Sequence, residues 1–459
     1  MKNFEFAFEC QSLESGETFM KRFQSFGDAD SLAGGIRLIC KRAHLLKLHV
    51  GACWKGVPSK VVKVDDPTTH DLDRPRPNRA PLRIDIDLTD YTQLEVDKND
   101  LEANDLHWPV LDLAITVTKR ALRECFGLDE VLCFYSGRRG VHLWVLDERA
   151  WEMNDEARAA VIDFMSCPLD EHGVVKDSFL GRTPLFVEMY QEEILPAFED
   201  MMRNSDMDLF TTAVAIGRFE RVLNLTHPEI RHVFRQLKMA GRESAVYKFK
   251  WLNDAVERLA SKHPSKCGWM RRRVRAGILS LLWPRFDKGA SSKLDHLMKA
   301  PFSVHSGTTR LAVPLRDDLS NFWPGDVLRV GCTEHEVHNI EGVLRDKLRA
   351  LGKPKPWANP TALFAPPGAD PVVEEVMRRG KKRKLCVVDV EDGNLRLKKR
   401  EVAHQRFYEV MRARCWVGMP SEEGARDVSS AALRALGSEE AVERWRAFHD
   451  AGVGLYGDL

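Results

Sequence analysis

The sequence predicts an α/β (α+β) fold, in which a mixed β-sheet core is flanked by helices and carries an inserted all-helical subdomain. Three observations support this class. Residues 82–88 (LRIDIDL) alternate between apolar and charged side chains with the period of a strand. Residues 108–126 place apolar side chains at the spacing of one helix face. Residues 150–282 have helical patterning and almost no strand-like segment, which indicates a separate helical insertion.

The other elements follow from local chemistry. The first 58 residues contain strand-like segments (FEFAFE and LKLHVGACW) and a helical stretch. The prolines of residues 65–81 are expected to prevent regular structure there. Pro109 suits the first position of its helix, because that position needs no backbone N–H. Two glycines divide residues 131–146 into a pair of apolar strands joined by a turn.

Beyond the helical stretch, strand-like segments return at residues 300–305 and 309–315. Thr333 and Glu336 form a capping box that opens a further helix, which ends at Gly352. The predicted domains are a sheet core over 1–149 and 283–352, a helical subdomain over 150–282, a Pro-rich linker with a basic segment over 353–399, and a helical C-terminal region over 400–459.

Composition limits the classes of function. The chain has 69 Lys and Arg against 68 Asp and Glu, so any surface that binds nucleic acid must be a local patch. The first residues do not resemble a secretory signal and no apolar run has membrane length, so we expect a soluble, intracellular protein. Ten cysteines occur without a C-x-x-C pair, which is typical of reduced thiols and indicates no cysteine zinc site.

Two acids interrupt the apolar strand of residues 82–88. Because side chains two apart on a strand face the same side, Asp85 and Asp87 project together while Ile84 and Ile86 enter the core. Two such carboxylates repel each other unless a cation lies between them. Hard oxygen ligands suit Mg²⁺ or Mn²⁺, and a metal pair can promote phosphoryl chemistry. The alternative is a half-exposed strand with two solvated acids.

Basic residues form two further clusters. The segment YSGRRGVH (135–142) places hydrogen-bond donors in a glycine-flanked turn that suits phosphate oxygens, namely Ser136, Arg138, Arg139 and His142. The segment LMKAPFSVH (297–305) adds Lys299, Ser303 and His305, and Asp287 precedes it. Taken singly, two arginines in a turn are more often surface charges, and a lone histidine is more often structural. The three acids and the basic clusters together are harder to explain as surface charges or structural residues.

At these motifs the sequence resembles a known family, the catalytic small subunit of archaeal and eukaryotic DNA primase. The segments DIDLTDY, YSGRRGVHLWV and KLDHLMKAPFSVH resemble the three signature blocks of that family in the same order. FEFAF and RFQSF near the N-terminus are also similar. The resemblance covers about residues 3–350 and weakens in the last hundred residues. It implies a primase that makes short RNA primers on single-stranded DNA with two Mg²⁺ or Mn²⁺ ions.

The resemblance also implies roles for individual residues. The metal-binding, catalytic acids would be Asp85, Asp87 and Asp287. The residues that hold the incoming triphosphate would be Ser136, Arg138, Arg139, His142, Lys299 and His305. Glu5 and Arg22 would lie near the initiating nucleotide, although a salt bridge between them is an equally plain interpretation. The implied partners are a single-stranded DNA template, NTPs, a primase large subunit and a replicative polymerase, in the nucleus of a eukaryote or the replication compartment of a virus-infected host.

One departure concerns zinc. The family usually carries a structural zinc site of Cys and His after the first block, but residues 92–108 contain no cysteine and only His107. We therefore expect no zinc. The remaining candidate ligands, Cys332, His335 and His338, coincide with the predicted capping box and are a weak metal site.

Other functions stay open at this point. A related primase-polymerase that prefers dNTPs and serves damage tolerance would carry the same motifs. A metal-dependent nucleotide-sugar transferase would explain the D-x-D but not Asp287 or the basic turn. A catalytically inactive nucleic-acid-binding subunit is disfavoured because all three acids are present. For template contact we considered the basic helix around Trp269 and Arg271, against a purely structural role.

Overall fold

The computed structural model describes residues 3–59, 75–327, 329 and 346, apart from residues 98, 172, 205–206, 242 and 320–321. The predicted α+β class is confirmed. The chain divides into two compact units, and the residues described in each belong to Met1–Ile86, Leu128–Ile162 and Phe286–Val390 for the first, and to Asp87–Gly127, Asp163–Arg285 and Glu391–Leu459 for the second. Residues 87–127, which the predicted domains assigned to the sheet core, thus group with the helical unit.

The strands form two sheets, whereas the sequence predicted one mixed sheet. Every pair with a defined register is antiparallel. The first sheet has the order β2-β1-β3-β4, with β8 paired to β3, and contains β1 (Phe4–Ser12), β2 (Thr18–Gln24), β3 (Ala43–Lys55), β4 (Arg76–Arg79) and β8 (Met298–Lys299). The second has the order β5-β7-β6-β9 and contains β5 (Leu82–Asp87), β6 (Val131–Tyr135), β7 (Gly140–Val145) and β9 (Val313–Pro314).

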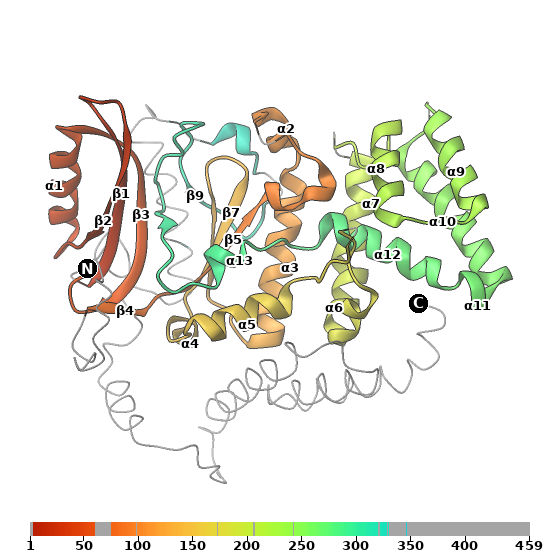
Figure 1. Ribbon diagram of the computed structural model, residues 1–459, viewed down its shortest axis with the longest axis horizontal. Helices are drawn as coiled ribbons and strands as arrows, with labels where there is room; N and C mark the ends of the chain where they lie inside the picture. Colours follow the sequence, from red (N-terminus) through yellow and green to blue (C-terminus); the bar gives the residue numbers. More distant parts are fainter. Residues whose placement is uncertain are drawn as a thin grey trace, which may run out of the picture. The chain divides into compact units, whose positions relative to one another are not determined.

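The helices of the first unit are short, except for the one that covers the first sheet. They are α1 (Ala29–Cys40), α4 (Glu148–Trp151), α13 (Lys288–Ser291) and η6 (Pro324–Asp326), and α5 (Asp155–Met165) runs across the boundary. Figure 1 shows α1 beside β1, β2 and β3. Leu32, Ile36 and Ile39 of α1 pack against Phe8 and Cys10 of β1, so an amphipathic helix closes the outer part of this core.

The strand β4 corrects one expectation. Residues 76–79 pair with β3 although Pro77 lies among them, so part of the Pro-rich segment has regular structure. The strand lies at the edge of its sheet, where a missing N–H removes no central hydrogen bond. Proline density therefore indicated the wrong state for these four residues.

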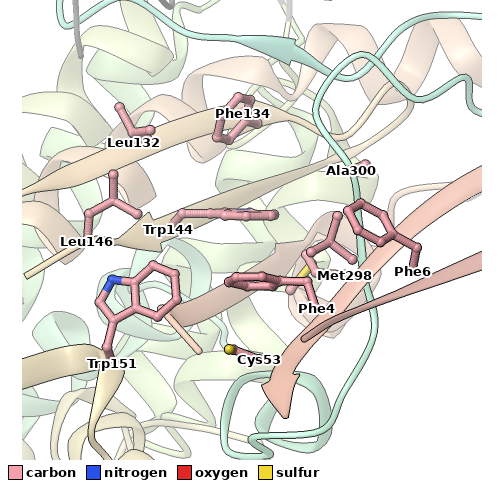
Figure 2. Close-up of a cluster of buried hydrophobic side chains, with 11 residues drawn as sticks. Phe4, Phe6, Cys53, Leu132, Phe134, Trp144, Leu146, Trp151, Met298 and Ala300 are labelled. Atoms are coloured by element: carbon pink, nitrogen blue, oxygen red, sulfur yellow. The ribbon is translucent and has the colours of Figure 1, made fainter. Parts of the chain in front are cut away.

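A buried cluster joins the two sheets of the first unit. Phe4, Phe6, Val50, Cys53, Met298 and Ala300 of the first sheet and its flank meet Leu132, Phe134, Trp144, Leu146 and Trp151. Figure 2 shows the Trp144 indole between Phe134 and Phe4. The Trp144 and Phe134 rings make an edge contact, with centroids 5.9 Å apart. Because His142 lies two residues before Trp144 on β7, it faces the same side of the sheet as this core.

The second unit is helical in its described residues. Its helices are η2 (Leu88–Asp90), η3 (Thr92–Leu94), α2 (Leu101–Leu106), α3 (Trp108–Phe126), η4 (Asp177–Arg182), α6 (Pro184–Met189), η5 (Tyr190–Ile194), α7 (Leu195–Asn204), α8 (Ala213–Leu223), α9 (Pro228–Met239), α10 (Ala245–Lys262), α11 (Pro264–Cys267) and α12 (Trp269–Leu282). The bounds of α3 match the predicted helix, with Pro109 in its first turn and Gly127 as a left-handed cap.

A wide helical turn separates α6 from α7. Over η5 the backbone hydrogen bonds reach five residues back, and Leu195 N–H donates to Tyr190 O. Pro196 follows directly and has no N–H for the carbonyl of Glu192, which explains why the regular ladder breaks here. Behind this turn, Phe179, Phe186 and Trp283 pack with ring centroids 4.7–5.1 Å apart.

Several expectations fall outside the described residues. They are the helix after Thr333, apart from residue 346, the weak metal candidates Cys332, His335 and His338, the linker and basic segment 353–399, and the region 400–459. The strand-like segment expected at 300–305 contains only the isolated bridge residue Val304, which pairs with Leu311, because β8 ends at Lys299. The segment expected at 309–315 is confirmed in part, since β9 contains two of its residues. Among the described helices, none is both long and apolar enough to span a bilayer.

Candidate active site

The carboxylates of β5 lie as the alternation predicted. Ile84 and Ile86 are fully buried, whereas Asp85 and Asp87 are half-buried on the other side of the strand. The backbone N–H of Asp287 donates to the carbonyl of Asp85 at 2.9 Å, and the Ser291 hydroxyl accepts from the N–H of Asp85. Two of the predicted catalytic acids are thereby brought together from opposite ends of the first unit's sequence. The Asp87 carboxylate accepts hydrogen bonds from Thr89.

A buried arginine anchors this strand. Arg83 is 3% exposed and donates to four carbonyls, those of Val50, Gly51, Leu294 and His296. Burial lowers the pKa of Arg83 to about 10, so the guanidinium remains charged at neutral pH. It ties β5 to β3 and to the segment that leads into β8. Sequence reasoning missed it, because an arginine in an alternating strand reads as solvent-facing.

The predicted basic turn forms a closed loop, which we call the 136–140 loop. Ser136 N–H donates to Gly140 O, and Gly140 N–H donates to the Ser136 hydroxyl. Gly137 has φ +93°, and a Cβ at this position would lie 2.9 Å from His305 Cβ. Glycine is therefore required, and its lack of a side chain lets His305 approach the loop. The half-buried Arg138 and Arg139 occupy the loop tip.

His142 lies beside the acids. Its Nε2 atom is 3.7 Å from Asp85 Oδ1, which brings the acidic and basic motifs into one site. Burial, reinforced by the charges of Lys299 and His49, lowers the pKa of His142 to about 3. His142 is consequently neutral at pH 7 and acts as a hydrogen-bonding group.

Lys299 and His305 complete the basic side of the site. Lys299 Nζ donates to Ser136 O at 2.6 Å, so β8 is fastened to the 136–140 loop. Burial, then the charges of Lys299, Lys47, Arg138 and Arg139, lower the pKa of His305 to about 3. Burial and these four cations together favour the neutral imidazole, and the cations supply the positive charge that binding a polyphosphate would require.

The lowered pKa of His305 predicts how stability depends on pH. Below pH 6.5 the unfolded chain binds a proton at this position that the folded chain does not bind, so the free energy of unfolding falls as pH decreases from about 6.5 toward 3. For one group the slope approaches about 1.4 kcal/mol per pH unit. Urea unfolding should show that the free energy of unfolding falls less between pH 6 and pH 5 for His305→Gln than for the unchanged protein. His44→Gln, at an exposed position of β3, is the control, and equal losses in all three proteins would contradict the assignment.

Polar residues of the first sheet extend this site and were missed by sequence reasoning. His49 pairs with Lys299 across β3 and β8, and its Nε2 atom is 3.6 Å from Glu9. Lys47 Nζ contacts both carboxylate oxygens of Glu9 at 2.9 Å. The signal was present in LKLHVG, where Lys47 and His49 alternate with buried or half-buried apolar residues. The strand that pairs with this segment, β8, lies about 250 residues further along the chain and could not be identified from the sequence.

Glu5 and Arg22 form a salt bridge. Glu5 is fully buried and accepts from Arg22 Nε at 2.9 Å, from Arg22 Nη2 at 3.3 Å, and from Phe23 N–H. The guanidinium carbon also lies 5.0 Å from the Phe23 ring centroid. The pair therefore has a structural role at the junction of β1 and β2. An additional role toward a nucleotide stays a prediction.

The acids fit a hard divalent cation by their chemistry, but they do not form a complete cage. In the described part of the chain, no three His, Cys, Asp or Glu side chains converge into a metal-ligand group. Mg²⁺ is commonly held by one or two carboxylates, with waters and substrate phosphates as its other ligands. Asp85 and Asp287, adjacent through their backbones, suit such a partial site.

The arginines of α12, the basic helix that could contact the template, already interact with other side chains. Arg271 pairs with Glu257, and Arg273 pairs with Asp170. Arg275 lies over the Tyr190 ring. Trp269 is 39% exposed, and its indole N–H donates to Lys266 O. The structural role of these arginines is thus the better supported one.

Comparisons with known proteins place the chain in a family. Residues 84–317, about half of the chain, match the family model described as DNA primase small subunit. Relatives named DNA primase small subunit include one from Schizosaccharomyces pombe, 26% identical over 64% of this chain and 63% of its own length, and one from Drosophila melanogaster, 25% identical over 68% and 71%. An archaeal relative of that name from Halorubrum lacusprofundi is 26% identical over 49% of this chain. The match thus spans just under two thirds of the fission yeast relative.

Proposed function

Because the chain belongs to the DNA primase small subunit family, we propose that it is the catalytic subunit of a primase and makes short RNA primers on single-stranded DNA. One observation carries this proposal. The carboxylate of Asp85 lies 3.7 Å from His142, in the same unit as the cations Lys299, Lys47, Arg138 and Arg139 that act on His305. Acids for a metal and bases for a triphosphate are the two requirements of nucleotidyl transfer.

The chain's own residues would divide this chemistry. Asp85, Asp87 and Asp287 would hold Mg²⁺ or Mn²⁺, which when bound neutralises phosphate charge and lowers the pKa of a hydroxyl nucleophile. The 136–140 loop, Lys299 and His305 would bind the triphosphate through charge-assisted hydrogen bonds. Neutral His142 would orient a phosphate or carboxylate oxygen next to Asp85. Catalysis would then rest on positioning and on electrostatic stabilisation of the transition state.

The deciding experiment measures template-directed synthesis. Purified protein with Mg²⁺ or Mn²⁺ is given labelled ATP or dATP on poly-dT, with poly-dA as the mismatched template. Incorporation of ATP on poly-dT but not on poly-dA would support a primase. Incorporation mainly of dATP would favour the primase-polymerase alternative. Incorporation that ignores the template, or none at all, would refute the proposal. The nucleotide-sugar transferase alternative predicts turnover of a nucleotide sugar without DNA.

We further propose the partners that a primase requires, namely the template, NTPs, a primase large subunit and a replicative polymerase. In a eukaryotic cell its place of work would be the nucleus. These proposals rest on the names of the relatives.

The Glu5–Arg22 pair allows a test of initiation. A primase must hold two free nucleotides for the first bond, whereas extension starts from an annealed end that supplies its own positioning. We expect Arg22→Ala to lower dinucleotide formation at least about tenfold, roughly 1.4 kcal/mol, and to change extension of an RNA primer much less. Lys21→Ala, at the neighbouring exposed position of β2, is the control. Equal losses in both assays would assign Arg22 to the fold, where its salt bridge already places it.

Metal analysis tests the prediction that this protein lacks the structural zinc that its family usually carries. Residues 92–108 supply no thiolate, and their single histidine is engaged with Ala103 O through Nδ1. We therefore propose that no structural zinc is needed here. Elemental analysis of the purified protein should find less than about 0.1 zinc per chain, and one zinc per chain would contradict this.

A further inference from the structure

Side chains from other parts of the first unit donate hydrogen bonds to the carbonyl groups of the 136–140 loop. Three consecutive carbonyls each accept a hydrogen bond from a side chain, and the three donors come from three different segments of the first unit. The acceptor and donor pairs, each at 2.6 Å, are Ser136 O with Lys299 Nζ, Gly137 O with Thr308 Oγ1, and Arg138 O with the Tyr135 hydroxyl. Three successive peptide planes of the loop are thereby held by side chains outside the loop tip.

This matters for anion binding. A carbonyl oxygen carries partial negative charge and repels a phosphate, so a loop that receives phosphates must keep its carbonyls turned away from them. Donors that occupy all three carbonyls hold the loop in such an orientation before the ligand arrives. Preorganisation of this kind avoids a reorganisation cost on binding.

A buried cation sets the direction of one of these bonds. Arg310 is 3% exposed, and its Nη1 atom donates to the Tyr135 oxygen at 3.2 Å. A guanidinium can only donate, so Tyr135 must accept here, and its single proton is left for Arg138 O. The charge of Arg310 also polarises the phenol and strengthens that second bond.

The turn that follows His305 links this histidine to the 136–140 loop. His305 N–H donates to Arg310 O at 2.8 Å, and Thr309 N–H donates to His305 O. Thr309 has φ +59°, an uncommon conformation for a residue other than glycine. Thr308, 5% exposed, projects from this turn to Gly137 O. One tight turn therefore carries His305 and also supports the 136–140 loop.

We propose that Thr308 and Tyr135, the latter oriented by Arg310, are positioning residues for the triphosphate of the incoming nucleotide. The inference rests on the proposed function and adds that these side chains act without touching the nucleotide. They hold the 136–140 loop and His305 in the geometry that receives the phosphates.

The test removes the Thr308 donor and restores it. Thr308→Val keeps the shape but loses the hydroxyl, whereas Thr308→Ser keeps the hydroxyl. In extension of an annealed RNA primer we expect Thr308→Val to raise the KM for NTP about tenfold with a change in kcat under about threefold, and Thr308→Ser to stay within about twofold of the unchanged protein. Ser306→Ala, at an exposed hydroxyl of the same turn, is the matched control.

A binding measurement separates this role from a general structural one. Calorimetry without template should show that Thr308→Val binds ATP about tenfold more weakly and binds AMP as the unchanged protein does, because only the phosphate contacts are affected. Tyr135→Phe retains the ring and removes the donor to Arg138 O, so it should also bind ATP more weakly and AMP normally. This variant tests the proposal if Thr308→Val does not fold.

Three results would overturn the inference: an unchanged KM in Thr308→Val and Tyr135→Phe, equal losses in Thr308→Val and Thr308→Ser, or a parallel loss of AMP binding. Failure of the unchanged protein to bind ATP or extend a primer would instead refute the proposed function. The two failures are thus distinguishable.

Discussion

Asp85→Asn is expected to lower primer synthesis at least about a thousandfold, roughly 4 kcal/mol of transition-state stabilisation, while leaving the fold intact. The neutral amide matches the carboxylate in size but lacks its negative charge, so it binds a divalent cation much more weakly. The contacts that fix Asp85 in β5 are made by its backbone, to Asp287 N–H and to the Ser291 hydroxyl, and these are retained. The measurement is the rate of labelled nucleotide incorporation on single-stranded DNA.

The control for this change is Asp129→Asn, which removes an exposed carboxylate from the same unit. It should retain full activity. Both variants should melt within a few degrees of the unchanged protein, since Asp129 is exposed and the backbone hydrogen bonds of Asp85 are retained. Asp287→Asn should resemble Asp85→Asn, and activity above about a tenth of normal in both variants would rule out the metal assignment.

Gly137→Ala is expected to reduce the free energy of unfolding by about 2–4 kcal/mol and to weaken triphosphate binding at least about tenfold. The backbone has φ +93° there, and the new Cβ would lie 2.9 Å from His305 Cβ and 3.0 Å from Arg310 O. Neither neighbour is the end of a flexible side chain. Either the 136–140 loop or the turn after His305 must therefore move, which separates two of the groups proposed to bind the triphosphate. Urea unfolding and calorimetry with ATP measure the two effects.

Gly16→Ala separates backbone strain from the clash. Gly16 also has positive φ, +71°, but a Cβ there would meet nothing within 4 Å. The free energy of unfolding of this variant should fall by only about 1 kcal/mol, the cost of alanine in the left-handed conformation, and its activity should be unchanged. Equal destabilisation by the two variants would show that close approach of His305 is not the reason for glycine at position 137.

Local periodicity determined much of this protein from the sequence alone. Alternation over residues 82–88 was enough to place Asp85 and Asp87 on one side of a strand, because the side-chain period of a strand does not depend on its partners. The helix over 108–126 and the hairpin over 131–146 were predictable for the same reason, since caps and turns act over a few residues. The residue types of the acidic and basic motifs likewise indicated their chemistry.

Tertiary structure decided which segments meet. The pairing of β3 with β8 and the contact of Thr308 with Gly137 join residues more than 170 positions apart, and no local pattern specifies such pairs. Burial decided the charge states, because the low pKa of His142 comes from desolvation and not from its sequence neighbours. Arg83 shows both effects, since only the packing of β5 against β3 turns an apparently solvated arginine into a buried anchor.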